Sequence, residues 1–153
     1  MLKRLFTPLV EALSEHREVA TEDRDTAIRK ATAVLMVDVA LADNVFHKQE
    51  LARILELVGL HFELESGEAT ELVDLAKDVA SDMTSLYEFT QLLHNSLTND
   101  EKINVVAMLW QIAYADGDLD KHEDALVLKI SDLLHVNRAR VMRAKSDAQT
   151  LLR

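Results

Sequence analysis

The sequence contains no cysteine, only one proline and only three glycines among its 153 residues. The absence of cysteine excludes disulfides, thiolate metal ligands and a cysteine nucleophile. Proline and glycine are the residues that most often interrupt helices, so their scarcity favours an all-α protein. Aromatic residues make up 5% of the chain, but hydrophobic residues make up 48%. These residues are enough for one folded domain over residues 1–153, and we do not expect disorder.

Basic residues are also in deficit, with 17 Lys and Arg against 27 Asp and Glu, for a net charge of −10. A surface of this sign repels nucleic acid and anionic lipid, and it favours cations or basic protein partners. No segment reaches the roughly 20 apolar residues that a membrane span needs. Pro8 and Glu11 interrupt the apolar N-terminal segment before it reaches the length of a signal-peptide core. These patterns predict a cytoplasmic protein that spans no membrane and binds no nucleic acid.

One pattern occurs twice in the chain. Ala40-Leu41-Ala42-Asp43 is followed seven residues later by Glu50, and Ala113-Tyr114-Ala115-Asp116 is followed seven residues later by Glu123. The flanking apolar positions match in the same register of 73 residues: Val39 with Ile112, Ile54 with Val127, Leu57 with Ile130 and Leu60 with Leu133. The repeat predicts two related helical units, at about 28–60 and 101–135, arranged around a pseudo-twofold axis.

Hydrophobic periodicity predicts a compact all-α bundle of seven or eight helices. Residues 25–42 and 101–115 are apolar on almost every side, which is typical of buried helices, so we expect these two to pack against each other. The other expected segments are a short amphipathic helix at 2–15, a polar linker at 15–25, a turn at 43–46, and helices at 47–59, 66–81, 86–94, 121–134 and 138–150. Gly59 is expected to end the 47–59 helix.

The densest acidic cluster is Asp116-Gly117-Asp118-Leu119-Asp120, followed by Glu123. Carboxylates gathered in a tight turn are typical of sites for Ca²⁺ or Mg²⁺, which prefer oxygen ligands. The segment has Lys121 and Val127 where an EF-hand loop requires glycine and glutamate, so the expected affinity is weak. The first unit repeats the arrangement with fewer carboxylates. The candidate metal ligands are Asp43, Glu50, Asp116, Asp118, Asp120 and Glu123.

Helix capping explains many of the same residues. Thr98 with Glu101, and Asp120 with Glu123, have the spacing of capping boxes, and Asn137 has the position of an N-cap. In this alternative the protein is a pure interaction scaffold whose acidic residues only cap helices. The sequence contains no zinc-ligand spacing, nucleophile elbow or phosphate-binding loop, so we do not expect an enzyme. The cation-binding and scaffold interpretations both remain open.

Several single residues carry further expectations. Asp38 and Gln111 are equivalent polar residues within the two apolar helices. Because a buried carboxylate is costly unless it is paired, we expect Asp38 to reach a backbone N–H, an arginine or water, with a supporting role behind the acidic turns as the alternative. Trp110 and Tyr114 are expected in the core, and the histidines at the surface or at helix caps.

The segment Leu109-Trp110-Gln111-Ile112-Ala113-Tyr114-Ala115-Asp116-Gly117-Asp118-Leu119-Asp120, with Glu123 and Ser131-Asp132-Leu133-Leu134-His135-Val136, resembles the tellurite-resistance protein B (TerB) family. Leu86-Tyr87-Glu88-Phe89-Thr90 fits its bacterial branch of uncharacterised small proteins. The resemblance covers roughly residues 10–147.

The resemblance implies a cytoplasmic all-helical domain with internal pseudo-symmetry and a role in stress or envelope-associated complexes. It places the family's shared acidic residues, for which cation binding has been proposed, at Asp43, Glu50, Asp116 and Glu123. A related domain occurs in a membrane-anchored DnaJ-type co-chaperone. This chain lacks the His-Pro-Asp motif of a J-domain, so co-chaperone activity is not implied, and it has no thiol for tellurite chemistry.

Overall fold

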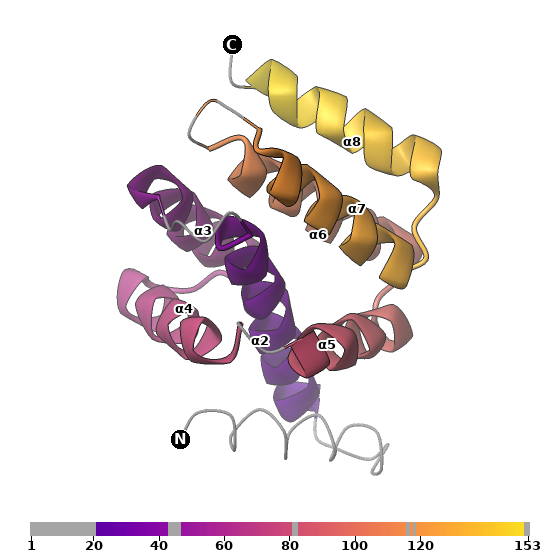
Figure 1. The fold of residues 1–153 in the computed structure, drawn as a ribbon. Coiled ribbons are helices and arrows are strands. Elements are labelled where there is room, and N and C mark those ends of the chain that lie inside the picture. The colour runs from indigo at the N-terminus through magenta and orange to yellow at the C-terminus, as the bar shows by residue number, and fades with distance from the viewer. Residues whose placement is uncertain (1–20, 43–46, 81–82, 116, 118, 152–153) are drawn as a thin grey trace.

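A computed structural model describes residues 21–42, 47–80, 83–115, 117 and 119–151, which form seven helices and no strand. The helices are α2 (Thr21–Ala40), α3 (Lys48–His61), α4 (Ser66–Val79), α5 (Met83–Ser96), α6 (Asn99–Ala113), α7 (Lys121–Leu133) and α8 (Arg138–Leu151) (Figure 1). The predicted all-α class is confirmed. The expected helix at 2–15 and turn at 43–46 lie outside the described residues. No helix among the described residues combines the length and hydropathy of a membrane span.

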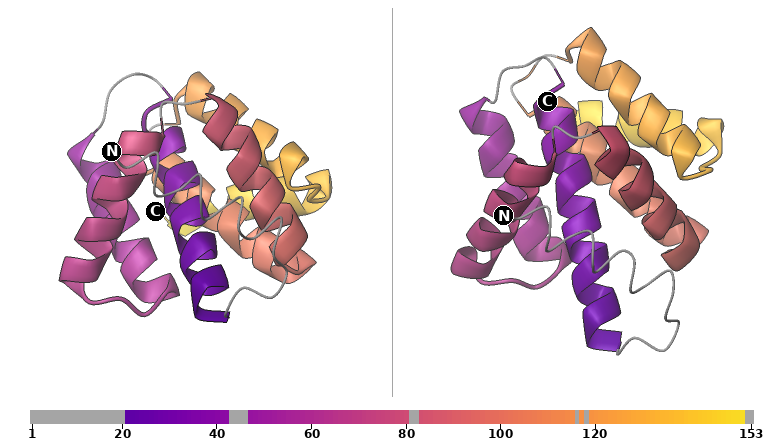
Figure 2. Two further views of the ribbon diagram at one scale, coloured as in Figure 1. Left: turned by 90° about the horizontal axis from the view of Figure 1, so that it is seen from below. Right: turned by 60° about the horizontal axis from the view of Figure 1, so that its bottom comes forward.

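Helix α2 is the central element of the bundle and contacts α3, α4, α5, α6 and α7. Figure 2 shows it running between α3 and α4 on one side and α5 on the other. Helix α6 contacts α2 and also packs against α7 and α8. The predicted contact between the two apolar segments is therefore confirmed. The internal repeat stays a prediction, and superposition of residues 30–60 on residues 103–133 would test it.

The burial of α2 and α6 follows from their composition. Between Ala31 and Ala40, only Asp38 is partly accessible, because almost no side chain in this stretch gains from contact with water. The hydroxyl of Thr32 donates to Ile28 O at 2.8 Å, which satisfies it inside the core. In α6, Trp110 is fully buried, and Tyr114 just beyond the helix is 6% exposed, so both lie in the core as predicted.

Two predicted boundaries are wrong. Helix α2 begins at Thr21, so residues 21–25 are helical and are not part of a linker; Arg24 and Asp25 are exposed, and a solvent-facing turn tolerates their polarity. Gly59 lies inside α3, and the left-handed residue is Glu63, with φ 55°. Leu64 N donates to Gly59 O at 2.9 Å, and the helix ends at His61, two residues after the glycine.

His94 departs from the prediction that histidines lie at the surface or at caps. It is half-buried on α5, where its Nδ1 lies 2.7 Å from Lys102 Nζ on α6. Its ring centroid is 4.3 Å from that of His135, which follows α7. Burial, then the nearby Lys102 and His135, lower the pKa of His94. His94 lies where the end of α5, the start of α6 and the end of α7 meet. Residue spacing in the sequence does not show that these three helix ends are close together.

The predicted capping box at the start of α6 is confirmed. Glu101 N donates to Thr98 Oγ1 at 3.2 Å, and Thr98 N donates to Glu101 Oε1 at 2.8 Å. The two hydrogen bonds satisfy backbone donors that the first turn of a helix leaves without helical partners. Asn137 caps α8 in a similar way, because its Oδ1 accepts from Ala139 N at 2.8 Å.

We expect the Thr98→Ala substitution to lower the free energy of unfolding by about 1 kcal/mol, because it removes the N-cap acceptor of α6. Urea denaturation followed by far-UV circular dichroism measures this change. Thr70→Ala is the matched control, since Thr70 is exposed within α4 and its hydroxyl bonds only to Ser66 O of the same helix. Alanine is the better helix former there, so the control should be neutral or slightly stabilising. Equal losses in both variants would contradict the role of Thr98 as a cap.

Candidate functional site

Two glutamates occupy the same place in the two predicted units. Glu50 lies in the first turn of α3, three residues after its N-cap His47, and Glu123 lies in the first turn of α7, three residues after its N-cap Asp120. Glu50 is 0% exposed and Glu123 is 1% exposed. Both carboxylate oxygens of each side chain are buried. Two carboxylates at equivalent, fully buried positions are the most unusual chemical feature of the described structure.

The helix periodicity explains why these glutamates point inward. Glu50, Ile54 and Val58 are spaced four residues apart and form one buried face of α3. Glu123 and Val127 begin the corresponding face of α7. A glutamate at the head of an apolar stripe is a pattern that can be found in the sequence. The amide groups and dipole of a helix N-terminus favour a negative charge in this first turn.

The predicted capping box between Asp120 and Glu123 is wrong, although Asp120 is the N-cap. The Asp120 carboxylate accepts from His122 N at 2.8 Å and lies 3.1 Å from His122 Nδ1. Burial alone would raise the pKa of Asp120, but these hydrogen bonds and the nearby His122 lower it below its ordinary value. The reciprocal hydrogen bonds of a capping box are present at the start of α6 and not at the start of α7, where Glu123 is buried.

The second turn has the backbone that its glycine predicts. Gly117 has a φ of 93°, which side-chain-bearing residues rarely adopt, and its N–H donates to Tyr114 O at 2.9 Å. Leu119 is half-buried against the core and holds the end of the turn to it. Three of the candidate ligands, Asp43, Asp116 and Asp118, lie outside the described residues.

The structure describes only part of the predicted ligand set. Within the described residues, no group of three or more histidine, aspartate or glutamate side chains is arranged to hold an ion. The structure describes Glu50, Asp120 and Glu123 among the six candidates, and Asp120 is engaged in capping. Buried carboxylates are hard oxygen donors, the kind that Ca²⁺ and Mg²⁺ prefer, so the donor set fits these ions.

Comparison with protein families decides which group the chain belongs to. A family model described as tellurite resistance protein TerB matches residues 29–146. The chain belongs to the TerB family. The TerB match extends from α2 into α8, so it includes both acidic turns and both buried glutamates. Neither the curated proteins nor the solved structures gave a match.

The TerB domain also contains a buried carboxyl in α2. Asp38 Oδ2 is buried and has no hydrogen-bond partner among the described residues, so the predicted pairing is not found for this atom. Burial raises the pKa of Asp38 to about 8. Its equivalent in the second unit, Gln111, is a half-buried neutral amide that lines a surface groove. In the predicted repeat the two units share a polar position, and only the first of them has an ionisable group there.

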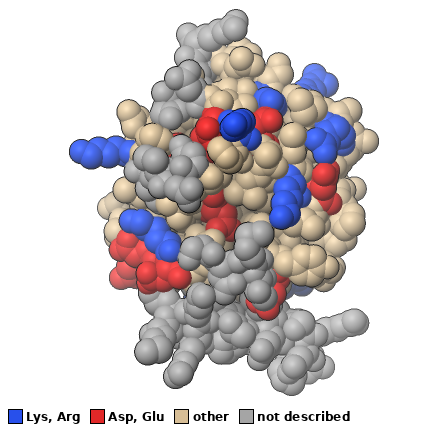
Figure 3. All heavy atoms as spheres, in the orientation of Figure 1, with Lys and Arg blue, Asp and Glu red and all other residues tan. Residues whose placement is uncertain are grey.

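Charge is unevenly distributed over the surface of the TerB domain. Figure 3 shows an acidic cluster over the region of α4 and basic side chains over the region of α7 and α8. The exposed acidic residues at the N-cap of α4 and along its length are Glu65, Glu68, Glu71, Asp74 and Asp78. Helix α8 is the opposite case, with four basic residues and one acidic residue. The chain thus offers faces of both signs in spite of its overall charge.

Proposed function

We propose that this TerB-family protein is a non-enzymatic cytoplasmic module that binds a divalent cation, Ca²⁺ or Mg²⁺. The proposed ligands are Glu50 and Glu123, together with aspartates of the two turns, Asp43, Asp116 and Asp118. The observation that carries the proposal is the complete burial of two glutamates in equivalent first turns. The description of the family as tellurite resistance proteins supports a role in stress response.

The energetics of burial favour a cation over capping alone. Moving a carboxylate from water into a protein interior is strongly unfavourable unless positive charge or hydrogen bonds compensate it. The N-terminus of α3 or α7 provides part of that compensation. A divalent ion shared with the turn aspartates would provide more, since each carboxylate oxygen is a good ligand for it. In the scaffold interpretation, the helix N-termini and neighbouring groups alone must compensate the burial of Glu50 and Glu123.

We expect millimolar Ca²⁺ or Mg²⁺ to raise the melting temperature. With a Kd of about 10⁻⁴ to 10⁻³ M, as in low-affinity calcium modules, 10 mM ion would stabilise the folded state by about 1 to 3 kcal/mol. Differential scanning fluorimetry with Ca²⁺, Mg²⁺, Mn²⁺ and Zn²⁺ measures the shift. The Asp116→Asn, Glu50→Gln and Glu123→Gln variants should each lose it, because each removes one negative ligand and preserves the side-chain shape.

Glu71→Gln provides the matched control, because Glu71 is exposed on α4 and far along the chain from both turns. This variant should retain the full thermal shift. Circular dichroism should show that all variants keep their helical content without metal. In NMR spectra, the cation should perturb residues 47–50 and 117–123 first. Absence of both the thermal shift and these perturbations at millimolar ion would leave the scaffold interpretation as the better account.

The second candidate function is a scaffold that binds a basic protein partner. The exposed acidic stripe of α4 favours it, since five like charges on one helix attract a basic segment through long-range electrostatics. Titration with a short lysine-rich peptide would distinguish the two candidates: the scaffold predicts NMR shifts along α4 that the Glu71→Lys variant weakens, with no dependence on divalent ions.

A further inference from the structure

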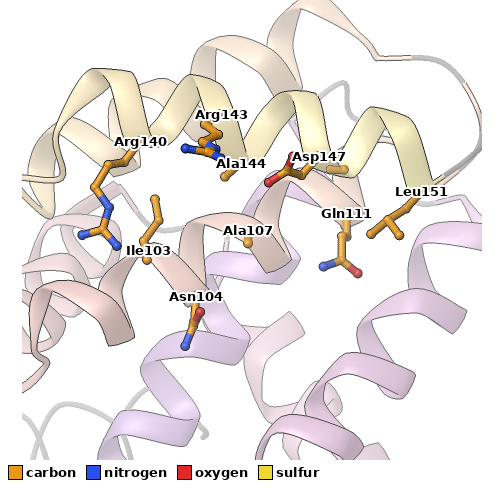
Figure 4. Close-up of a pocket in the computed structure, with 10 residues that line it drawn as sticks. Ile103, Asn104, Ala107, Gln111, Arg140, Arg143, Ala144, Asp147 and Leu151 are labelled. Carbon is orange, nitrogen blue, oxygen red and sulfur yellow. The ribbon is translucent and has the colours of Figure 1, made fainter.

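A groove open to solvent runs between α6 and α8, with a volume of about 420 Å³ (Figure 4). A second cavity of about 190 Å³ adjoins it, because Gln111, Ala148 and Leu151 line both. The second cavity adds Arg53 of α3 to the lining. The two cavities form one continuous surface on helices α3, α6 and α8, which we call the α6–α8 groove.

The floor of the α6–α8 groove is narrow and apolar. Ala107 of α6 and Ala144 and Ala148 of α8 line it, and their small side chains permit the close approach of another backbone. Ile103 lies towards one end, and Leu151, which is 72% exposed, lies at the other. From Arg140 to Leu151 the groove follows about three turns of α8, or roughly 16 Å at about 1.5 Å per residue. These dimensions suit a short helix laid along the two helices.

The charged residues around this floor are predominantly basic. Arg140 and Arg143 lie towards one end and Arg53 towards the other, with Asp147 as the single carboxylate in the lining. Arg53 Nη1 also lies 3.2 Å from Glu56 Oε1 of the same helix, but both side chains are partly exposed, so this pair is weak and exchangeable. The amides of Asn104 and Gln111 add hydrogen-bonding groups from α6. On a chain with a net charge of −10, a groove with three arginines stands out from the rest of the surface.

Arg143 is the cation of α8 with no internal role in the described structure. Arg138 pairs with Asp132 at 2.9 Å, and Lys145 pairs with Asp124 at 2.6 Å. Arg140 Nη2 lies 3.1 Å from Asp100 Oδ1, but the Asp100 side chain is 88% exposed, so this pair is weak and exchangeable. Arg143 forms no ion pair or hydrogen bond with any described residue. Its guanidinium is therefore available to a carboxylate from outside.

We infer that the α6–α8 groove is a docking site for an acidic amphipathic helix of a partner protein. The apolar stripe of that helix packs on the alanine floor, and its carboxylates pair with Arg143 and Arg140 at one end and Arg53 at the other. Charge complementarity selects an acidic partner, whereas the proposed cation site lies in the turns before α3 and α7. The two activities are separable because they use different residues.

Two synthetic peptides of 14 residues test this inference. One is an amphipathic helix with a leucine and alanine stripe and glutamates towards both ends, and the other has glutamine in place of every glutamate. Fluorescence anisotropy of labelled peptide measures affinity, and NMR locates the contact. We expect the glutamate peptide to shift the amides of α6 and α8, with an affinity that weakens as ionic strength rises. The glutamine peptide should bind at least about tenfold more weakly.

Matched protein variants show which residues of the protein bind the glutamate peptide. Arg143→Glu should weaken binding of the glutamate peptide about tenfold, because it replaces an attraction with a repulsion. Lys129→Glu makes the same change of charge at an exposed position of α7 outside the groove and should change the affinity less than about twofold. Asn104→Trp should also block binding, since Asn104 is exposed on α6 and a larger ring would fill the groove. Glu50→Gln should leave peptide binding unchanged, which separates this result from the proposed cation site.

Four outcomes would overturn the inference. The first is equal binding of the two peptides, or no shifts in α6 and α8 at millimolar peptide. The second is an equal effect of Arg143→Glu and Lys129→Glu. The third is concentration-dependent self-association that Arg143→Glu abolishes, which would make a second copy of the chain the occupant. The fourth is Arg143-dependent binding to phosphatidylserine vesicles without binding to the peptide, which would assign the groove to a membrane surface.

Discussion

Replacement of Asp38 by asparagine is expected to stabilise the protein at neutral pH. Burial raises the pKa of Asp38 from 3.8 to about 8, so the folded state retains a proton that the unfolded state releases above pH 4. Stability therefore falls as pH rises from about 4 to about 8, by up to 1.4 kcal/mol per pH unit. At pH 7 the Asp38→Asn variant should exceed the wild type by about 4 kcal/mol at most, because the amide has no proton to lose.

A more specific test is how the difference in unfolding free energy between Asp38→Asn and the wild type changes with pH. Urea denaturation of both proteins at pH 5.5 and 7.5 should show the advantage of Asp38→Asn growing by about 2 to 3 kcal/mol over that interval. Asp74→Asn, at an exposed position of α4, is the matched control and should show no such growth. A constant difference between the two pH values would mean that Asp38 does not change its protonation there. The predicted repeat places a neutral amide, Gln111, at the equivalent position of α6.

Substitution of Trp110 by alanine should destabilise the protein by about 3 to 5 kcal/mol. Trp110 is fully buried on α6, and its Nε1–H donates to Val141 O of α8 at 3.1 Å. Lys145 Nζ lies 5.1 Å from the ring centroid and also pairs with Asp124 of α7. The indole therefore links α6 to α8, and Lys145 extends the contact to α7; removal of the indole leaves a large cavity as well as a lost hydrogen bond.

The Trp110→Phe variant separates the contribution of the buried apolar volume from that of the indole hydrogen bond. It preserves most of the apolar volume and loses the indole N–H, so we expect it to cost about 1 to 2 kcal/mol. Because Trp110 is the only tryptophan, unfolding of these variants must be followed by circular dichroism and not by tryptophan fluorescence. Tyr87→Ala is the control, since Tyr87 is 63% exposed on α5 and should change stability by less than about 0.5 kcal/mol. A similar small change in Trp110→Ala would contradict a structural role for the α6–α8 junction.

Local patterns in the sequence determined the helices and several of their ends. The all-round apolar stretches predicted two buried helices in contact, because such segments have no polar face to present to water. Thr98, Asp120 and Asn137 were identified as N-caps from side-chain chemistry alone, since an N-cap needs only an acceptor within its own turn. The segment from Leu109 to Asp120, with Glu123 and Ser131 to Val136, also indicated the TerB family, whose model matches residues 29–146.

The same local reasoning failed where a distant segment decided the outcome. Glu123 has the spacing of a capping-box residue, but it is buried, because its position also heads the apolar stripe that packs into the core. Gly59 has the chemistry of a helix end, yet α3 continues to His61; Glu63 takes the left-handed conformation instead, and Leu64 packs against the core. His94 is half-buried because Lys102 of α6 and His135, which follows α7, lie against it.

The sequence by itself thus determined the fold class, the family and the repeated acidic turns, because these depend on neighbours within a few residues along the chain. Only the tertiary structure decided that Glu50 and Glu123 are buried, that Asp38 Oδ2 has no hydrogen-bond partner among the described residues, and that arginines of α3 and α8 border one groove. Burial and surface charge are properties of how helices pack, and packing joins residues that the chain order separates.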